Sequence, residues 1–134
     1  MTSPHKPTIL IVDDDPLVLD AMYELFYDDF TALLARTGEK ALEFAEQQLE
    51  IDAVVLDIKM AGMDGVETCR RLKVVRPGLP FIIHTGFPGA HQRQQIETLL
   101  APFAYIIKGR SFQQLVDAVR LACKMSATED PGSD

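Results

Sequence analysis

Five short, mainly apolar runs alternate with longer amphipathic segments, and this alternation limits the possible folds most strongly. Such continuous runs are typical of strands that are buried on both faces of a parallel sheet. Because crossovers between parallel strands are right-handed, the pattern predicts an α/β fold with one five-stranded parallel sheet covered by helices on both faces. We expect this sheet to be doubly wound, in the common order 2-1-3-4-5. The expected strands cover residues 8–12, 30–35, 53–56, 81–84 and 104–107.

The segments between the runs carry helix start signals and apolar residues at helical spacing. Asp15 is a good N-cap residue, with Pro16 at the first helical position. Asp64 and Ser111 are each followed three residues later by Glu or Gln, which is the pattern of a capping box. The expected helices cover about residues 16–26, 39–49, 64–73, 92–100 and 112–123, and the fourth is the most polar.

Length and composition indicate one ordinary globular domain. We expect the domain to cover residues 8–124, with a disordered segment at 1–7 and a flexible acidic tail or linker start at 125–134. The net charge of −7 argues against nucleic-acid binding, which requires clustered Lys and Arg. No run has membrane-spanning length and no signal peptide is visible, so we expect no membrane association and a cytoplasmic protein with reduced cysteines.

Polar side chains with distinct chemistries stand where the predicted strands end. Asp13 and Asp14 follow the first strand, Asp57 the third, Thr85 ends the fourth and Lys108 follows the fifth. In a sheet of this order, these carboxyl ends meet at the switch point between the first and third strands, where open α/β sheets bind ligands. Each residue alone is explained by a cap or a loop, but their joint placement predicts a functional site.

These side chains suit the transfer of a phosphoryl group to a carboxylate. Three neighbouring carboxylates either take up protons or bind a cation, and oxygen ligands without His or Cys favour Mg²⁺ over zinc. A metal-held carboxylate such as Asp57 can attack a phosphate as nucleophile and form an aspartyl phosphate. Lys108 supplies a positive charge for the phosphoryl oxygens, and Thr85 supplies a hydroxyl that can reorient onto a new acceptor.

Four motifs together resemble the receiver domain of two-component response regulators, which has a flavodoxin-like or CheY-like (βα)5 fold. The resemblance covers about residues 8–124 and implies a phosphoacceptor that relays a signal, not an enzyme that turns over an independent substrate. The motifs are Ile-Leu-Ile-Val-Asp-Asp-Asp-Pro at 9–16, Val-Val-Leu-Asp-Ile-Lys-Met-Ala-Gly-Met-Asp-Gly at 54–65, Ile-Ile-His-Thr-Gly at 82–86 and Ala-Tyr-Ile-Ile-Lys at 104–108.

This resemblance implies roles for the acidic residues. Asp57 would be the phosphoacceptor, with a sensor histidine kinase, a phosphotransfer protein or a small molecule as the donor. Asp14, Asp57 and the backbone carbonyl of Lys59 would hold Mg²⁺, and Asp13 would bind the ion through water.

The resemblance also implies a conformational switch. Thr85 and Lys108 would contact the phosphoryl group, and Tyr105 matches the aromatic switch residue, whose ring turns inward when the Thr hydroxyl moves to the phosphate. Phosphorylation would then shift a population by giving both contacting residues a new partner. The implied recipient is a downstream effector protein or domain, and the face made by the fourth helix, fifth strand and fifth helix is implied for a homodimer.

Two positions depart from the family pattern. Ala61 stands where proline is usual, and we expect only a slightly looser loop. Gly109 stands where a cis-proline usually follows the lysine. A cis bond costs roughly 2.5–4 kcal/mol before glycine, against roughly 0.5–1 kcal/mol before proline. We therefore predict a trans Lys108–Gly109 bond, a re-routed loop and a less firmly placed lysine.

Lys59 and Phe87 occupy two positions that in the family tune the access of hydrolytic water. Our hypothesis is that the long cation and the bulky ring shield the acyl phosphate and lengthen its lifetime. The alternative, in which Lys59 is an ordinary solvated loop residue, stays open.

Two other function classes compete with this interpretation. Phosphatases of the haloacid dehalogenase type also use an aspartate at a strand end, but they have a second acid two residues later, where this chain has Lys59. A pseudo-receiver that binds proteins without phosphorylation is disfavoured by the intact set of acids, threonine and lysine, although Gly109 keeps it open. His84 and the other two histidines are not grouped, so we expect no metal or phosphotransfer role for them.

Overall fold

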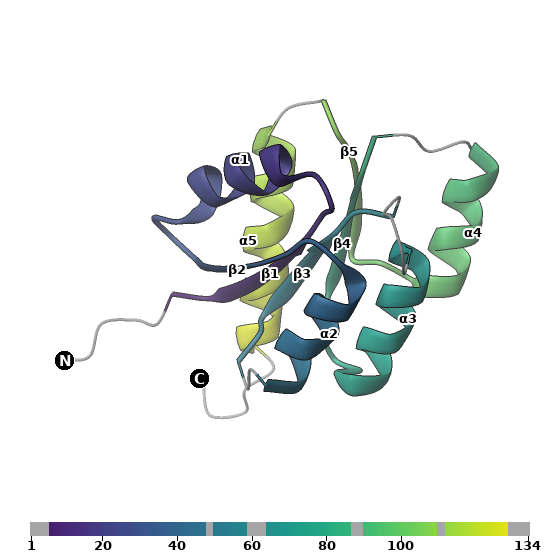
Figure 1. Ribbon diagram of the computed structural model, residues 1–134, viewed down its shortest axis with the longest axis horizontal. Coiled ribbons are helices and arrows are strands. Elements are labelled where there is room, and N and C mark those ends of the chain that lie inside the picture. Colours follow the sequence, from purple (N-terminus) through teal and green to yellow (C-terminus); the bar gives the residue numbers. More distant parts are fainter. Residues whose placement is uncertain (1–5, 48–49, 59–63, 87–89, 110–111, 129–134) are drawn as a thin grey trace.

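The computed structural model describes residues 6–47, 50–58, 64–86, 90–109 and 112–128. In this part of the chain, parallel strands form a five-stranded sheet in the order β2-β1-β3-β4-β5, with helices on both faces (Figure 1). The strands are β1 (Thr8–Val12), β2 (Thr31–Ala35), β3 (Ala53–Leu56), β4 (Phe81–Thr85) and β5 (Ala104–Ile107). The helices are α1 (Pro16–Phe26), α2 (Gly38–Gln47), α3 (Gly65–Val75), α4 (Ala90–Leu100) and α5 (Phe112–Thr128). The predicted fold class and strand order are confirmed.

The clearest differences from the predicted elements lie at two helix ends. Helix α3 ends at Val75, where the cap residue Arg76 still donates its backbone N–H to the carbonyl of Leu72. Helix α5 runs to Thr128, although we expected the domain to end at residue 124. The sequence between Lys124 and Thr128 contains neither glycine nor proline, so no local signal stops the helix there.

The helix start signals operate as predicted at two sites. The Asp15 carboxylate accepts from the N–H of Leu17 at 2.9 Å, and the Asp64 carboxylate accepts from the N–H of Glu67 at 2.8 Å. The predicted capping box of α3 is nevertheless incomplete, because the Glu67 carboxylate bonds to arginines of the next turn. Ser111, the expected cap of α5, lies outside the described residues.

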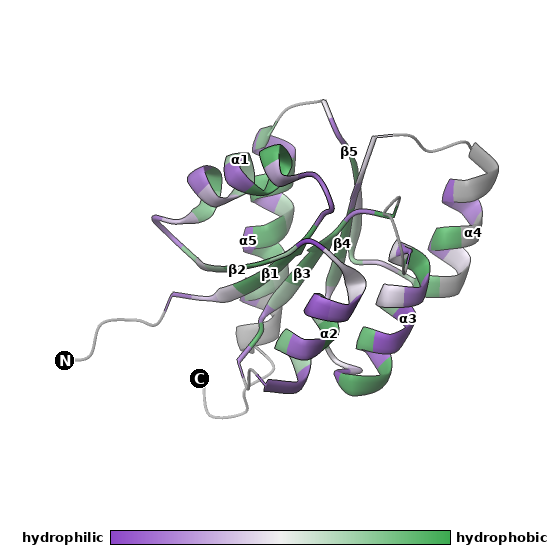
Figure 2. Ribbon diagram, viewed as in Figure 1, coloured by the Kyte–Doolittle hydropathy of each residue, from purple (hydrophilic) through white to green (hydrophobic). Residues whose placement is uncertain are grey.

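The core has two layers, one on each face of the sheet. Figure 2 shows that the strands between them are strongly hydrophobic. One layer lies under α2, α3 and α4, and the other lies under α1 and α5 (Figure 1). Side chains of β1 alternate between them: Leu10 and Val12 belong to the first layer, and Ile9 and Ile11 to the second. This double burial fixes the strands, and it therefore also fixes the positions of their carboxyl ends. None of the helices in the described ranges combines the length and apolar character that crossing a bilayer requires.

Candidate functional site at the carboxyl ends of the strands

The register of the central strands makes Asp13 and Asp57 neighbours. Val12, the last residue of β1, pairs with Leu56, the last residue of β3. The N–H of Asp57 donates to the carbonyl of Val12 at 2.9 Å, and the N–H of Asp13 donates to the carbonyl of Ala35 at 3.0 Å. Both aspartates are thus placed at the same edge of the sheet by backbone pairing.

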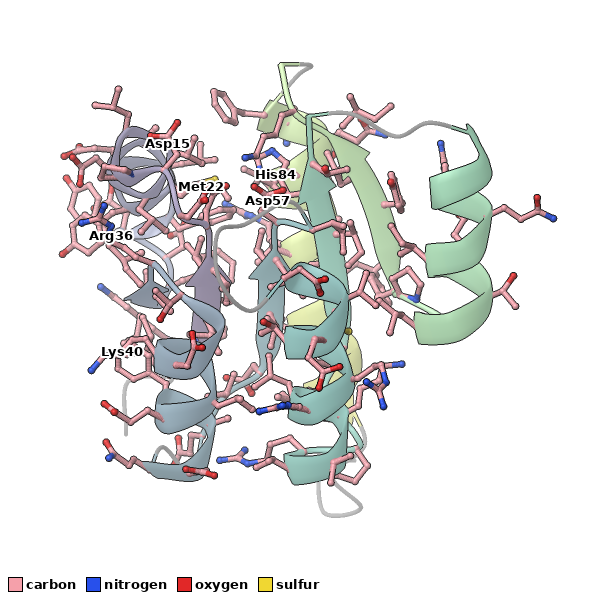
Figure 3. All side chains as sticks on the ribbon, turned by 45° about the vertical axis from the view of Figure 1, so that its right-hand side comes forward. Asp15, Met22, Arg36, Lys40, Asp57 and His84 are labelled. Atoms are coloured by element: carbon pink, nitrogen blue, oxygen red, sulfur yellow. The ribbon has the colours of Figure 1, made fainter. Side chains whose placement is uncertain are left out.

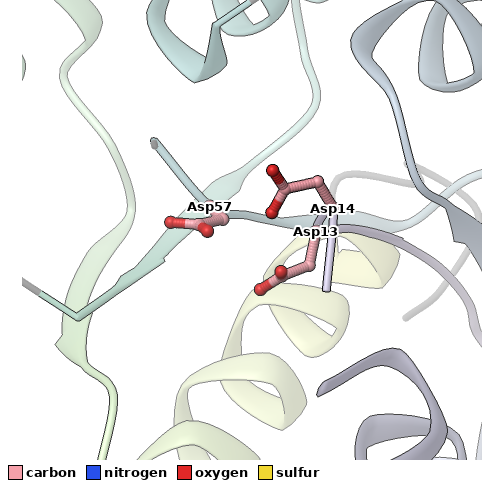
Figure 4. A group of neighbouring side chains, drawn as sticks. All are labelled: Asp13, Asp14 and Asp57. Atoms are coloured by element: carbon pink, nitrogen blue, oxygen red, sulfur yellow. The ribbon is translucent and has the colours of Figure 1, made fainter. Parts of the chain in front are cut away.

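Three carboxylates converge at this edge. Asp13, Asp14 and Asp57 each offer an oxygen, and these oxygens all lie within 4.8 Å of one another (Figure 4). Asp13 and Asp57 are buried, with exposed fractions of 2% and 5%, whereas Asp14 is half-buried. A compact set of carboxylate oxygens, with water completing the shell, suits a hard cation such as Mg²⁺. The structure therefore brings together the three acids that the sequence analysis grouped.

Lys108, directly after β5, joins this cluster. Its ammonium lies 2.7 Å from the Asp13 carboxylate and 3.1 Å from the Asp57 carboxylate, and its backbone N–H donates to the carbonyl of Thr85 at 2.7 Å. The trans Lys108–Gly109 bond is confirmed, because the described residues contain no cis peptide bond. Gly109 has φ +85°, in the left-handed region that glycine adopts easily.

The expectation that Lys108 is less firmly placed stays a prediction. In this structure the ammonium pairs with two buried carboxylates, Asp13 and Asp57. Burial would by itself lower the pKa of Lys108, but the hydrogen bonds to Asp13 and Asp57 outweigh it and raise that pKa. The lysine therefore stays charged and offsets part of the repulsion within the acidic cluster.

Burial shifts the pKa of Asp13 in the opposite direction from that of Lys108. Loss of solvent raises the pKa of the Asp13 carboxyl, and the hydrogen bonds from Lys108 and from the Asp15 backbone offset this only in part. The negative charge of Asp57 raises it further. Asp13 is thus a carboxylate that would gain from an additional cation nearby.

Thr85 and Tyr105 lie on one face of the sheet, beside α3 and α4. Thr85 is buried at the end of β4, two residues beyond Ile83, which pairs with Tyr105 of β5. Residues two apart on a strand share a face, and both Ile83 and Tyr105 pack in the layer under α2, α3 and α4. The Tyr105 hydroxyl oxygen is buried and has no hydrogen-bond partner among the described residues.

His84, to which the sequence analysis gave no role, faces the other side of the sheet next to the site. It is 6% exposed and lies close to Asp57 and Met22 in Figure 3. Together with Lys108 it lines a pocket of about 220 Å³, whose other walls are mainly apolar side chains of α1 and α5. Burial, and then the charge of Lys108, lower the pKa of His84 to about 4. The sequence contained one signal for this position of His84. It directly precedes Thr85, and adjacent strand residues face opposite layers, so it lies at the same strand end on the other face of the sheet.

Besides Ser111, three residues singled out in the sequence analysis lie outside the described residues. They are Lys59, with its expected Mg²⁺-binding carbonyl, the variant loop position Ala61, and Phe87. The shielding hypothesis for Lys59 and Phe87 therefore stays a prediction.

Comparison with known proteins places this geometry in a family. The chain is 30% identical over 133 residues to the transcriptional regulatory protein ZraR of Salmonella typhimurium, and the match covers 96% of this chain but 29% of that protein. The chain thus spans less than a third of this relative.

Solved structures agree with the sequence relatives. A CheY-like response regulator receiver domain protein from Methanospirillum hungatei has a TM-score of 0.85 and 25% identity, with 93% of this chain and 99% of that chain covered. The signal receiver domain of an HD domain-containing protein from Pseudomonas fluorescens has a TM-score of 0.86 and 25% identity, with 92% and 99% covered. The family model of the response regulator receiver domain matches residues 9–120. The chain therefore belongs to the response regulator receiver domain family of two-component signal transduction.

Proposed function

We propose that this receiver domain accepts a phosphoryl group on Asp57 in a Mg²⁺-dependent reaction. The observation that carries the proposal is the convergence of three carboxylates and the Lys108 ammonium at one edge of the sheet. The Asp57 carboxylate contacts this ammonium at 3.1 Å, and a buried carboxylate beside a cation is suited to approach an anionic phosphate.

In the proposed reaction, a carboxylate oxygen of Asp57 attacks the phosphorus atom of the donor. A P–O bond forms, and the bond from phosphorus to the donor nitrogen or oxygen breaks, with its electron pair leaving on the donor. A Mg²⁺ ion held by Asp14 and Asp57, with Asp13 reaching it through water, would reduce the repulsion between the two anions. Lys108 then turns from the carboxylates to the new phosphoryl oxygens, and Thr85 donates its hydroxyl to one of them.

The proposed phosphodonor is a sensor histidine kinase or a phosphotransfer protein, and the proposed recipient is an effector protein or domain. Tyr105 reports the state of Thr85 to the surface around α4, β5 and α5, which is also the proposed face for a homodimer. We propose a cytoplasmic location for this exchange. The chain acts as a phosphoacceptor that loses its phosphoryl group by hydrolysis, not as an enzyme with an independent substrate.

The test is the intact mass of the full chain after incubation with acetyl phosphate and Mg²⁺. We expect one added phosphoryl group in the native chain and none after Asp57→Ala or with EDTA present. Asp52→Ala is the matched control, because the Asp52 carboxylate bonds to the N–H of Thr8 at the opposite edge of the sheet. An adduct that survives in Asp57→Ala would refute the assignment of the acceptor. Absence of any adduct, also with a kinase and with beryllofluoride, would favour the pseudo-receiver.

Magnesium alone should stabilise the fold. An ion that binds only the folded state, and is present at a free concentration of about ten times its dissociation constant, adds about 1.4 kcal/mol to the free energy of unfolding. We expect this gain in the native chain and its loss in Asp14→Asn, because one charged ligand of the cluster is removed. Thermal unfolding with and without Mg²⁺ measures it, with Asp20→Asn on the exposed side of α1 as the control. Equal gains in the native chain and in Asp14→Asn would contradict the assigned ligand set.

A further inference from the structure

The ring of Tyr105 is covered by an arginine of α4. The guanidinium carbon of Arg93 lies 4.7 Å from the centre of the Tyr105 ring, within the range of a cation–π contact. The hydroxyl end of the same ring is buried, and the ring packs in the layer under α2, α3 and α4. Arg93 thus lies over a ring that already points into the protein.

A second side chain orients this arginine. The Glu97 carboxylate lies 3.6 Å from the Arg93 guanidinium, one helical turn further along α4. Ile96 and Leu100 share this side of the helix and are buried in the core. The spacing of 93, 96, 97 and 100 therefore places Arg93 at the edge of the apolar stripe, from which it contacts Tyr105 of β5.

Different contacts hold the two ends of α4 against the rest of the protein. At the C-terminal end, the Lys73 ammonium donates to the carbonyl of Leu100, where a positive charge is favourable at a helix terminus. Toward the N-terminal end, the contact between Arg93 and Tyr105 joins the helix to β5. The position of the Tyr105 ring is therefore coupled to the N-terminal half of α4.

We propose that Arg93 is a latch that holds the Tyr105 ring inward and ties α4 to β5. The role of this latch in signalling rests on the proposed switch role of Tyr105. In a chain with this latch, the inward position of the Tyr105 ring is already favoured before phosphorylation. The phosphoryl group then shifts the same equilibrium further toward the inward position. Release of Arg93, for example by a partner that offers it a carboxylate, would free the ring and the helix together.

The latch is tested with the full chain, with its tyrosine rings isotopically labelled and no phosphodonor present. The chain contains three tyrosines, and Tyr105→Phe identifies the signal of Tyr105. A soluble paramagnetic agent then reports the exposure of that ring to solvent. A half-exposed cation–π contact changes an equilibrium by roughly two- to fivefold. We expect Arg93→Met, which keeps an unbranched apolar side chain and removes the charge, to shift the ratio of outward to inward ring by this factor.

Two further variants separate the latch from a general loss of charge. Arg93→Lys should restore part of the inward population, because it keeps a cation. Arg120→Met should leave Tyr105 unchanged, because Arg120 is an exposed arginine of α5 that pairs with Asp29. Unchanged Tyr105 exposure in Arg93→Met, or an equal change in Arg120→Met, would overturn the latch. Phosphorylation is measured separately by mass, so failure of the receiver reaction and failure of the latch are distinguishable.

Discussion

Gly65→Ala is expected to lower the free energy of unfolding by about 3 kcal/mol, the upper end of the usual cost of overpacking. A β-carbon on Gly65 would lie 2.8 Å from the carbonyl oxygen of Ile58, and closer still to the carbonyl oxygen of Asp57 and the Cα of Ile58. All three are backbone atoms, and the N–H of Gly65 also donates to the Ile58 carbonyl at 2.9 Å. Neither the added β-carbon nor these backbone atoms can shift without moving the segment that carries Asp57.

The same substitution should slow phosphorylation of the molecules that remain folded. A displacement of about 1 Å in a reacting group can cost on the order of 100-fold in rate, so we expect a loss of that order in adduct formation. Gly78→Ala is the matched control, because a β-carbon there meets no atom within 4 Å. It should change the free energy of unfolding by less than about 1 kcal/mol. Urea unfolding and intact mass measure the two effects, and native values for Gly65→Ala in both would contradict the close approach.

The fold could be predicted because two local signals agreed along the whole chain. Short apolar runs marked the strands, and one-sided apolar spacing marked the helices between them. The ends of α3 and α5 were predicted less well, since α3 continues to Val75 and α5 to Thr128, past the predicted ends at about residues 73 and 123. Helix ends depend on a few weak interactions and are therefore the least determined by pattern.

The sequence predicted which residues make up the site, but not which of them pair with one another. The order of the strands was enough to place Asp13, Asp14, Asp57 and Lys108 at one edge. The exact partners were not, because the strand order alone does not show that the Lys108 ammonium reaches both Asp13 and Asp57. Contacts between layers, such as Arg93 over Tyr105, depend on how a helix is rotated on the sheet, which no local pattern determines.

His84 should make the protein less stable in mild acid. The pKa of its imidazole is about 4 in the folded protein, against 6.5 for an unperturbed histidine. Between these values the unfolded chain binds a proton that the folded chain does not, so the free energy of unfolding falls as the pH is lowered. This shift corresponds to a loss of about 2 kcal/mol by pH 5 and about 3 kcal/mol by pH 4, and none above pH 7.

His84→Leu isolates this effect, because it removes the titrating ring and keeps an apolar side chain in the pocket that Met22 also lines. Asp13, whose pKa is raised, acts in the opposite direction: its contribution is present at low pH and is lost as the pH rises. The raised pKa of Lys108 contributes stability that is constant at any pH well below the ordinary lysine value of 10.5 and is lost only above it, so it does not change between pH 7 and pH 4. The difference between the two urea-unfolding curves, measured with EDTA from pH 7 to pH 4, therefore belongs to His84. Parallel curves, or an imidazole proton signal in the native chain that titrates near pH 6.5, would show that the ring is charged inside the fold and that its burial has no such cost.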